Sequence, residues 1–510
     1  MDFKNNPFRS RLFVIVSSAV FWGILAHGMA LFNKFSYHDD TSAFNGVGVT
    51  YDIGRWALAL MGDSYRKLTG GYLYSIPLIN GMTTIVCIGL ILFLVYRMMD
   101  FTDPFIGILV TGIFVTFPSV TSVFGYMFTA PYYYFGLLLG VWGISIYDRR
   151  KSILSMAACI ALLCFSTGVY QANLPCCVSV MVLLLIRDVS QSECRFSDFL
   201  KKAVTALLLA LASLLLYLGL NRFFLKQQGI SLIADHRGLD TMGMTDLSGY
   251  LSRMAKAYKE FFFPTAGSAE NMFPFTSRYL HMAIIAVCLI LAVMFLVKVY
   301  RENILKGLEL SILLALYPLA AYLIFVIVNI NGIHSLMTFG EVFTFLLAVW
   351  LYEKVKISHR LIRILKKSMI VLISLLLFMN IRFSNLCYLK ADVLQSQVIS
   401  YYTTLAARIR SVKQYTDETP VVYINASKKH EVSLAGADPW FKSIELLPYN
   451  FSTLINNYEW KNNMAFWTGF NPIVASSEPF LKSPIVAVMP SYPDNGSIKY
   501  IDGCIVVKFS

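Results

Sequence analysis

The sequence predicts an α-helical polytopic membrane protein with about 11 transmembrane helices, followed by a small C-terminal α/β or α+β domain. Hydrophobic residues make up 57% of its 510 residues and charged residues only 14%, which is too apolar for a soluble chain of this length. Runs of about twenty apolar residues, enough to cross roughly 30 Å of hydrocarbon, recur up to residue 381. Beyond residue 382, polar residues separate short β-branched runs, which indicates a folded domain outside the membrane.

The apolar runs are the expected spans. We expect the first to be an uncleaved helix rather than a secretory signal, because it is long and further spans follow it. His27 is the main ionisable residue expected inside a span, whereas a proton-coupled transporter should keep acids or bases near mid-membrane. The expected spans cover 12–32, 76–96, 105–123, 127–147, 152–170, 174–187, 203–221, 279–297, 308–330, 337–352 and 368–381.

Basic residues alternate between the two sides of the predicted bundle. They gather in every second short connection, as at Arg97 and Arg149, whereas the connections at 121–126, 171–173 and 331–336 contain no Lys or Arg. By the positive-inside rule the N-terminus is cytoplasmic and the C-terminal domain lies outside. The net charge of +13 then reflects topology, and no nucleic acid is expected as a partner.

The sequence divides into a transmembrane domain, 1–381, and a C-terminal domain, 382–510. Two outward loops of the first domain, 33–75 and 221–278, are too short for cores of their own and should cover the bundle at the membrane surface. The C-terminal domain has helix-like sequence near 392–414 and then the strand-like runs PVVYIN, SPIVAVMP and GCIVVKF.

Of the nine cysteines, only Cys387 and Cys504 are expected outside. Whether they pair in a disulfide is left open by the sequence.

The first outward loop contains two adjacent acids, Asp39 and Asp40, in the stretch NKFSYHDDTSAF. A solvated turn is the ordinary interpretation of such a pair. The alternative is a catalytic carboxylate, and the polar sequence that follows favours it. Asp235, in the second outward loop, is the next candidate.

The same loop continues with an amphipathic pattern from Ile53 to Leu68, which predicts a helix lying on the membrane surface. At 100° per residue, Arg55 and Arg66 nearly coincide on its polar face. Their planar forks of donors suit a phosphate-bearing ligand. Attraction to lipid headgroups is the alternative.

Further outward polar residues are candidates for substrate binding. Each has a structural alternative, such as an aromatic belt at the interface for the tyrosine or an interhelical hydrogen bond for the amides. No histidine belongs to a ligand set with metal spacing, so no cofactor is firmly expected and a divalent cation is left open. The candidates are His38, Tyr133, Gln171, Asn173 and His334.

The motifs SYHDDT, YDIGRW and STGVYQAN together resemble the glucosyl transferase type II family, which includes the serotype-converting O-antigen glucosyltransferases of the GT-C superfamily. The resemblance is best over roughly 1–180 and implies a GT-C-like transmembrane domain in the bacterial inner membrane, with the C-terminal domain in the periplasm. It implies a sugar donor carried on polyprenyl phosphate and a glycan acceptor such as O-antigen. Asp39 and Asp40 match the first-loop acid of such enzymes, and Arg55 matches a donor-phosphate contact.

The chemistry agrees with this resemblance. A carboxylate base can take the proton of an acceptor hydroxyl as it attacks the anomeric carbon, and cationic donors stabilise the leaving phosphate. One dominant acid favours inversion, because retention would need a separate nucleophile. The alternatives are a lipid-linked sugar flippase or transporter, and another GT-C-type transferase acting on lipid A.

Overall fold

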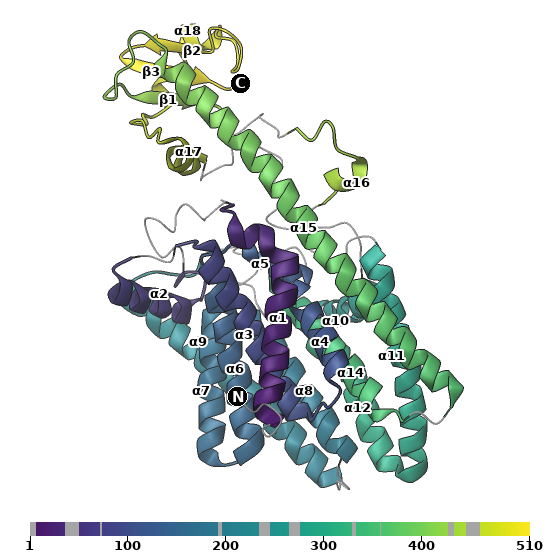
Figure 1. Cartoon of the computed structure of the whole chain (residues 1–510). Coiled ribbons are helices and arrows are strands. Elements are labelled where there is room, and N and C mark those ends of the chain that lie inside the picture. Colours follow the sequence, from purple (N-terminus) through teal and green to yellow (C-terminus); the bar gives the residue numbers. More distant parts are fainter. Residues whose placement is uncertain are drawn as a thin grey trace.

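The computed structural model shows a bundle of helices and a small sheet, which lies at the far end of one long helix (Figure 1). The segments that contain His38, Asp39, Asp40 and Asp235 lie outside the described residues. The structure describes residues 7–35, 50–71, 74–191, 196–233, 245–264, 276–328, 333–356, 359–426, 433–444 and 460–510.

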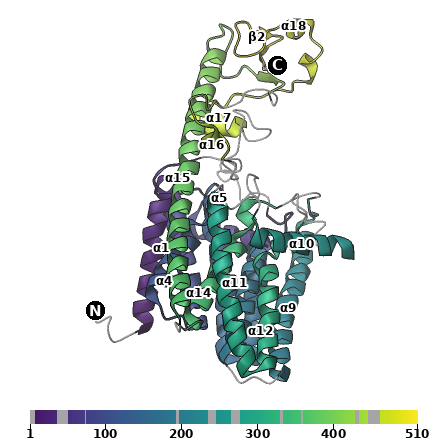
Figure 2. The same ribbon diagram turned by 90° about the vertical axis from the view of Figure 1, so that its right-hand side faces the viewer.

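Every apolar run that the sequence marks as a span contains helix. Two further helices, α2 (Trp56–Thr69) and α10 (Leu247–Phe262), lie across one end of the bundle (Figures 1 and 2). The bundle is formed by α1 (Pro7–Phe32), α3 (Pro77–Met99), α4 (Pro104–Thr116), α5 (Pro118–Phe124), α6 (Ala130–Arg150), α7 (Ile153–Val169), α8 (Asn173–Gln191), α9 (Phe196–Gln228), α11 (Thr276–Glu302), α12 (Ile304–Ala321), α13 (Ile324–Ile327), η5 (Ser335–Met337), η6 (Phe339–Phe343), α14 (Thr344–Lys354) and the first part of α15 (Arg360–Arg410).

The lengths and compositions of these helices identify a polytopic membrane protein. Among the described residues, six helices are long and apolar enough to cross a bilayer. The number is seven if α4 and α5, which meet at an angle of 42°, form one span. Pro118 begins α5 directly after the bend, and a proline cannot continue the hydrogen bonding of the preceding helix. The total of eleven spans stays a prediction.

The two ends of the bundle differ. We call the end from which α15 rises toward the sheet the sheet-side end, and the end at which α1 begins the opposite end (Figure 1). Short connections at the opposite end join α3 to α4, α6 to α7, α8 to α9 and α11 to α12. Basic residues occupy the last turns of three of these helices, with Arg97 in α3, Arg149 and Arg150 in α6, and Arg301 in α11.

A three-stranded sheet forms the core of the C-terminal region, together with the end of α15 and α17 (Trp460–Thr468). Its order is β1 (Val421–Ile424), β3 (Cys504–Lys508), β2 (Ile498–Ile501), with β1 parallel and β2 antiparallel to β3. The predicted strands in PVVYIN and GCIVVKF are confirmed. The predicted strand in SPIVAVMP is wrong, because Pro484 begins the short helix α18 (Pro484–Ala487), where its fixed φ suits a first helical turn.

Helix α15 passes without a break through Arg382, where the sequence places the domain boundary. That boundary therefore falls within a helix of 51 residues and stays a prediction. Cys387 is buried in α15 and Cys504 belongs to β3. Both are free thiols in this structure.

Candidate functional site

The sheet-side end carries a group of polar and aromatic side chains around Arg55, which we call the Arg55 cluster: Arg55, Tyr133, Tyr170, Gln171, Asn173 and Tyr217. The group brings together residues of a turn before α2, the start of α6, the connection between α7 and α8, and α9. Three of the site residues predicted from the sequence besides Arg55 belong to it: Tyr133, Gln171 and Asn173.

A tight turn from Tyr51 to Gly54 sets the position of Arg55. The Gly54 amide donates to the Tyr51 carbonyl at 3.0 Å, and the Arg55 amide donates to the Thr50 carbonyl at 2.7 Å. Gly54 has a φ of +74°. This conformation costs glycine little, and a helix cannot continue through it. The predicted helical start at Ile53 is therefore wrong, since α2 begins at Trp56. In the same turn, burial and the nearby Asp63 raise the pKa of the Tyr51 hydroxyl above its ordinary value.

Two side chains of the bundle hold this turn in place. Gln171 donates through Nε2 to the Ile53 carbonyl at 2.9 Å and to the Tyr217 hydroxyl at 3.1 Å. The Tyr217 hydroxyl in turn donates to the Gly54 carbonyl at 3.0 Å. Carbonyls of the turn thus have partners at a place where buried backbone groups would otherwise be unsatisfied.

Trp56 fixes the start of α2 against the bundle. Its ring stacks on Phe224 of α9, with 5.3 Å between centroids. The indole also lies close to Gly168 of α7, where an added Cβ would lie 2.6 Å from it. The close approach requires glycine at this position, so the packing of α7 and α9 determines where α2 begins.

The Arg55 guanidinium lies over a pair of stacked rings. Its Nη1 donates to the Tyr133 hydroxyl at 2.8 Å, and its central carbon lies 4.9 Å from the centroid of Tyr170. The two rings are stacked at 4.2 Å, and Asn173 donates to the Tyr133 carbonyl at 3.2 Å. Within the described residues, Nε of Arg55 is buried without a hydrogen-bond partner. This arrangement holds the cation in place and leaves a donor for a ligand.

Arg66 does not join this cluster. It pairs with Asp63 at 3.7 Å, and its side chain is 48% exposed. Because Arg55 precedes the first turn of α2 and Arg66 lies in its last turn, eleven residues separate them, or roughly 16 Å along the helix axis. The two arginines therefore do not form one clamp.

His334 lies half-buried directly before η5. The hydroxyl of its neighbour Ser335 is hydrogen-bonded to that of Ser122 in α5 at 2.7 Å. This contact ties the segment to the bundle, and the role of His334 in substrate binding stays a prediction.

Most of the chain matches a known protein family. The model of the family described as Glucosyl transferase GtrII matches residues 28–345, well over half of the chain. The chain belongs to the glucosyl transferase GtrII family. A comparison with curated proteins gave no significant match.

The match confirms the resemblance seen in three motifs of this GtrII-family chain and extends it from the end of α1 to α14. It covers the whole Arg55 cluster. Family membership supports a membrane-embedded glucosyltransferase, which acts on a sugar donor and an acceptor.

Buried acids are the feature of this family member that sequence reasoning missed. Glu341 of η6 and Glu260 of α10 are 3% and 7% exposed, and both interact electrostatically with Tyr322. Glu260 also pairs with Lys256 at 3.0 Å. Glu309 of α12 is buried as well, and within the described chain neither of its carboxylate oxygens has a hydrogen-bond partner.

The expectation that His27 is the main ionisable residue inside the spans is therefore wrong. Glu309 and Glu341 fall within the apolar runs 308–330 and 337–352, where a single acid between hydrophobic residues is an available signal. His27 itself is structural, because its ring nitrogens lie 2.7 Å from the Tyr388 hydroxyl and 2.9 Å from the Val115 carbonyl. It links α1 to α15 and α4.

No group of three or more His, Cys, Asp or Glu side chains able to hold a metal ion occurs in the part of the chain that the structure describes. Because the first-loop acids lie outside that part, the question of a divalent cation is untested.

Proposed function

We propose that this chain is a glucosyltransferase of the bacterial inner membrane, which moves glucose from a polyprenyl-phosphate-linked donor to a periplasmic glycan such as O-antigen. The Arg55 cluster carries the proposal. A guanidinium fixed over two tyrosine rings keeps a buried Nε that has no hydrogen-bond partner among the described residues, at an end of an apolar bundle. Such a fork of donors matches the oxygens of a lipid phosphate.

Asp39 or Asp40 is the proposed general base. The described chain on both sides of the segment that contains them is firmly packed. Before it, Phe35 stacks on Tyr388 of α15 with 6.3 Å between centroids, and Gln395 donates to the Lys34 carbonyl at 3.0 Å. After it, Thr50 accepts the hydrogen bond from the Arg55 amide. The acids thus belong to a segment whose downstream end is the turn that carries Arg55.

The proposed reaction is a direct displacement. The oxygen of an acceptor hydroxyl forms the new bond to the anomeric carbon, while the bond from that carbon to the donor phosphate breaks. The carboxylate takes the hydroxyl proton, and the bonding electrons leave with the polyprenyl phosphate, whose charge Arg55 stabilises. The product is glucosylated glycan with inverted configuration at the anomeric carbon.

A lipid-linked sugar transporter is the second candidate. The buried Glu309 favours it, because its carboxylate has no hydrogen-bond partner among the described residues, and an acid buried in a membrane helix is costly and commonly serves proton coupling. A transferase that acts on lipid A would share the proposed donor site and differ only in its acceptor.

The test uses the purified full chain in nanodiscs with acceptor glycan. Polyprenyl-phosphate glucose and a nucleotide glucose are supplied in separate reactions, and glucosylated product is measured by mass spectrometry. We expect product from the lipid-linked donor only. Product from the nucleotide sugar without a lipid intermediate would contradict the proposal. Movement of intact lipid-linked sugar across the membrane of sealed proteoliposomes, without product, would support the transporter.

A further inference from the structure

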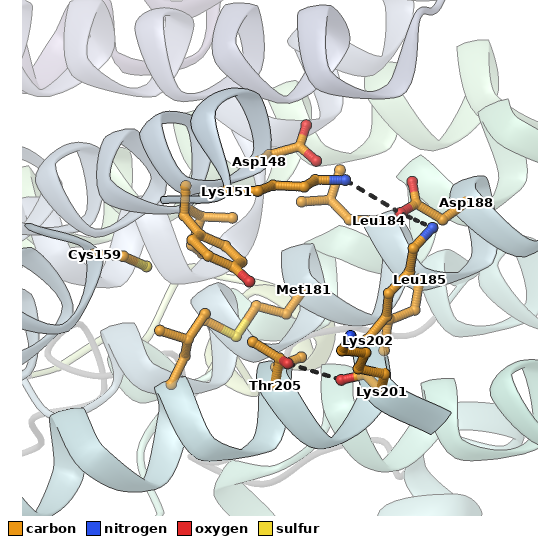
Figure 3. A pocket seen from close by; sticks show the side chains of 14 residues that line it. Asp148, Lys151, Cys159, Met181, Leu184, Leu185, Asp188, Lys201, Lys202 and Thr205 are labelled. Atoms are coloured by element: carbon orange, nitrogen blue, oxygen red, sulfur yellow. Dashed lines mark hydrogen bonds and ion pairs between the residues drawn. The ribbon is translucent and has the colours of Figure 1, made fainter. Parts of the chain in front are cut away.

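The opposite end of the bundle contains a cavity of about 370 Å³ between α6, α7, α8 and α9, partly open to its surroundings (Figure 3). It is remote from the Arg55 cluster, because it lies where α6 and α8 end and where α7 and α9 begin. Its volume falls within the range of pockets that bind small molecules. The transfer reaction proposed above makes no use of it.

The inner wall of this cavity is apolar. Side chains of α7, α8 and α9 form it, and they include Cys159, Met181, Leu184, Leu185 and Leu209. A sugar or a nucleotide would leave its polar groups unsatisfied against such a wall, at considerable cost. A hydrocarbon chain has no polar groups and would not incur this cost.

The rim of the cavity is cationic. Lys151, Lys201 and Lys202 line it, and the Lys151 and Lys202 side chains are 53% and 36% exposed. Asp188 lies between these two ammonium groups, at 3.9 Å from Lys151 and 3.0 Å from Lys202 (Figure 3).

The carboxylates at the rim are largely engaged by an arginine. Arg187 binds both oxygens of Asp148 at 2.9 and 2.8 Å, and it also donates to Asp188. Among the described residues at this rim, four cations therefore accompany two carboxylates, and positive charge is left over there for an anionic ligand.

The surface of α9 beside the cavity is lipid-facing. Leu207 and Leu208, each 58% exposed, directly follow the cavity-lining residue Ala206. A ligand with a hydrocarbon chain can therefore enter from the bilayer, with its charged group at the level of the lysines.

We propose that this cavity binds one anionic phospholipid of the adjacent leaflet, with an acyl chain against the apolar wall and the phosphate at Lys151 and Lys202. Charge complementarity favours a lipid with net negative charge over a zwitterionic one. The apolar wall favours a lipid over free phosphate. By the positive-inside rule, this leaflet is the cytoplasmic one.

The test is native mass spectrometry of the full chain in detergent. The protein is titrated with phosphatidylglycerol, with phosphatidylethanolamine and with inorganic phosphate. We expect one phosphatidylglycerol to remain bound at the lowest concentrations, with roughly tenfold weaker binding to the K151Q/K202Q variant. The matched control is K306Q/K356Q, which removes the same charge from the first turn of α12 and from the connection between α14 and α15, and it should bind as the wild type does.

A second variant, A206F, fills the cavity without changing its charge and should also lose the lipid. Thermal unfolding without lipid identifies any variant that fails to fold. Three results would each overturn the proposal. The first is equal binding of the two lipids, and the second is unchanged binding in both the K151Q/K202Q and the A206F variants. The third is displacement of the bound lipid by millimolar inorganic phosphate.

Discussion

Arg55 and Arg187 are both held within the helical bundle, but they lie at its two ends. They also differ in how many of their side-chain nitrogens have hydrogen-bond partners among the described residues. Arg187 directs all of its nitrogens to fixed acceptors: Asp148, Asp188 and the Met98 carbonyl. The only hydrogen bond that the Arg55 side chain makes to the described residues is to the Tyr133 hydroxyl, and its Nε is unpartnered there. A saturated guanidinium has nothing left for a ligand, whereas an unsaturated one that is held in place by aromatic rings does. The comparison assigns a structural role to Arg187 and supports the proposed binding role of Arg55.

The largest expected effect on the transfer rate comes from replacing the proposed catalytic acids, Asp39 and Asp40. Asp39→Asn and Asp40→Asn are expected to lower the transfer rate at one or both positions by about 10²–10⁴-fold, because the acceptor hydroxyl loses its base. Transfer in nanodiscs and protein abundance are measured together. Wild-type rates in both variants would move the base elsewhere, with Asp235 the next residue to test.

Arg187→Met is expected to be the most destabilising change. It leaves Asp148 and Asp188 largely buried, at 15% and 17% exposed, without their principal partner, and breaking a buried ion pair commonly costs about 3–5 kcal/mol. Unfolding in detergent should show this loss, and the fraction that stays folded should use the donor with an unchanged KM. A stable Arg187→Met protein with impaired donor use would reverse the comparison.

Gly168→Ala tests whether the packing of Trp56 positions Arg55. The new Cβ would lie 2.6 Å from the indole, and overpacking of this kind typically costs about 1–3 kcal/mol. We expect a raised KM for the lipid donor, because the turn before α2 is displaced. Gly219→Ala in α9 is the matched control, since its Cβ would meet no atom within 4 Å, and it should leave KM unchanged.

Arg66→Ala should have the smallest effect. Its ion pair with Asp63 is exposed, and such pairs contribute less than about 1 kcal/mol. Both stability and donor KM are expected to stay near wild-type values. A loss of donor use comparable to that of an Arg55 variant would restore the two-arginine phosphate site that the sequence suggested.

Sequence reasoning reached the bundle because apolar length and basic alternation are local signals. Both are visible in single segments, such as 76–96 with Arg97 at its end. It also reached Tyr133, Gln171 and Asn173, because polar residues at the mouths of apolar runs are conspicuous. It could not show that Gln171 holds the turn at Ile53, since 118 residues separate the two.

The wrong start predicted for α2 has the same origin. The conformation of Gly54 moves the start of the helix from Ile53 to Trp56, and it depends on contacts with Gln171 and Tyr217 that are distant in sequence. The ion pair of Arg187 leaves no local signal in the sequence either, because its partner Asp148 lies 39 residues away. Glu341, in contrast, was visible within an apolar run and was overlooked.

The central claim is that Arg55 binds the donor phosphate, and the most direct measurement is the donor dependence of transfer by Arg55→Ala and Arg55→Lys proteins in nanodiscs. We expect Arg55→Ala to lose about 10²–10³-fold in kcat/KM for polyprenyl-phosphate glucose, with an unfolding temperature near that of the wild type. Arg55→Lys should lose less, because a point charge retains part of the attraction but not the fork. Wild-type kcat/KM in Arg55→Ala, or a loss explained entirely by unfolding, would contradict the claim.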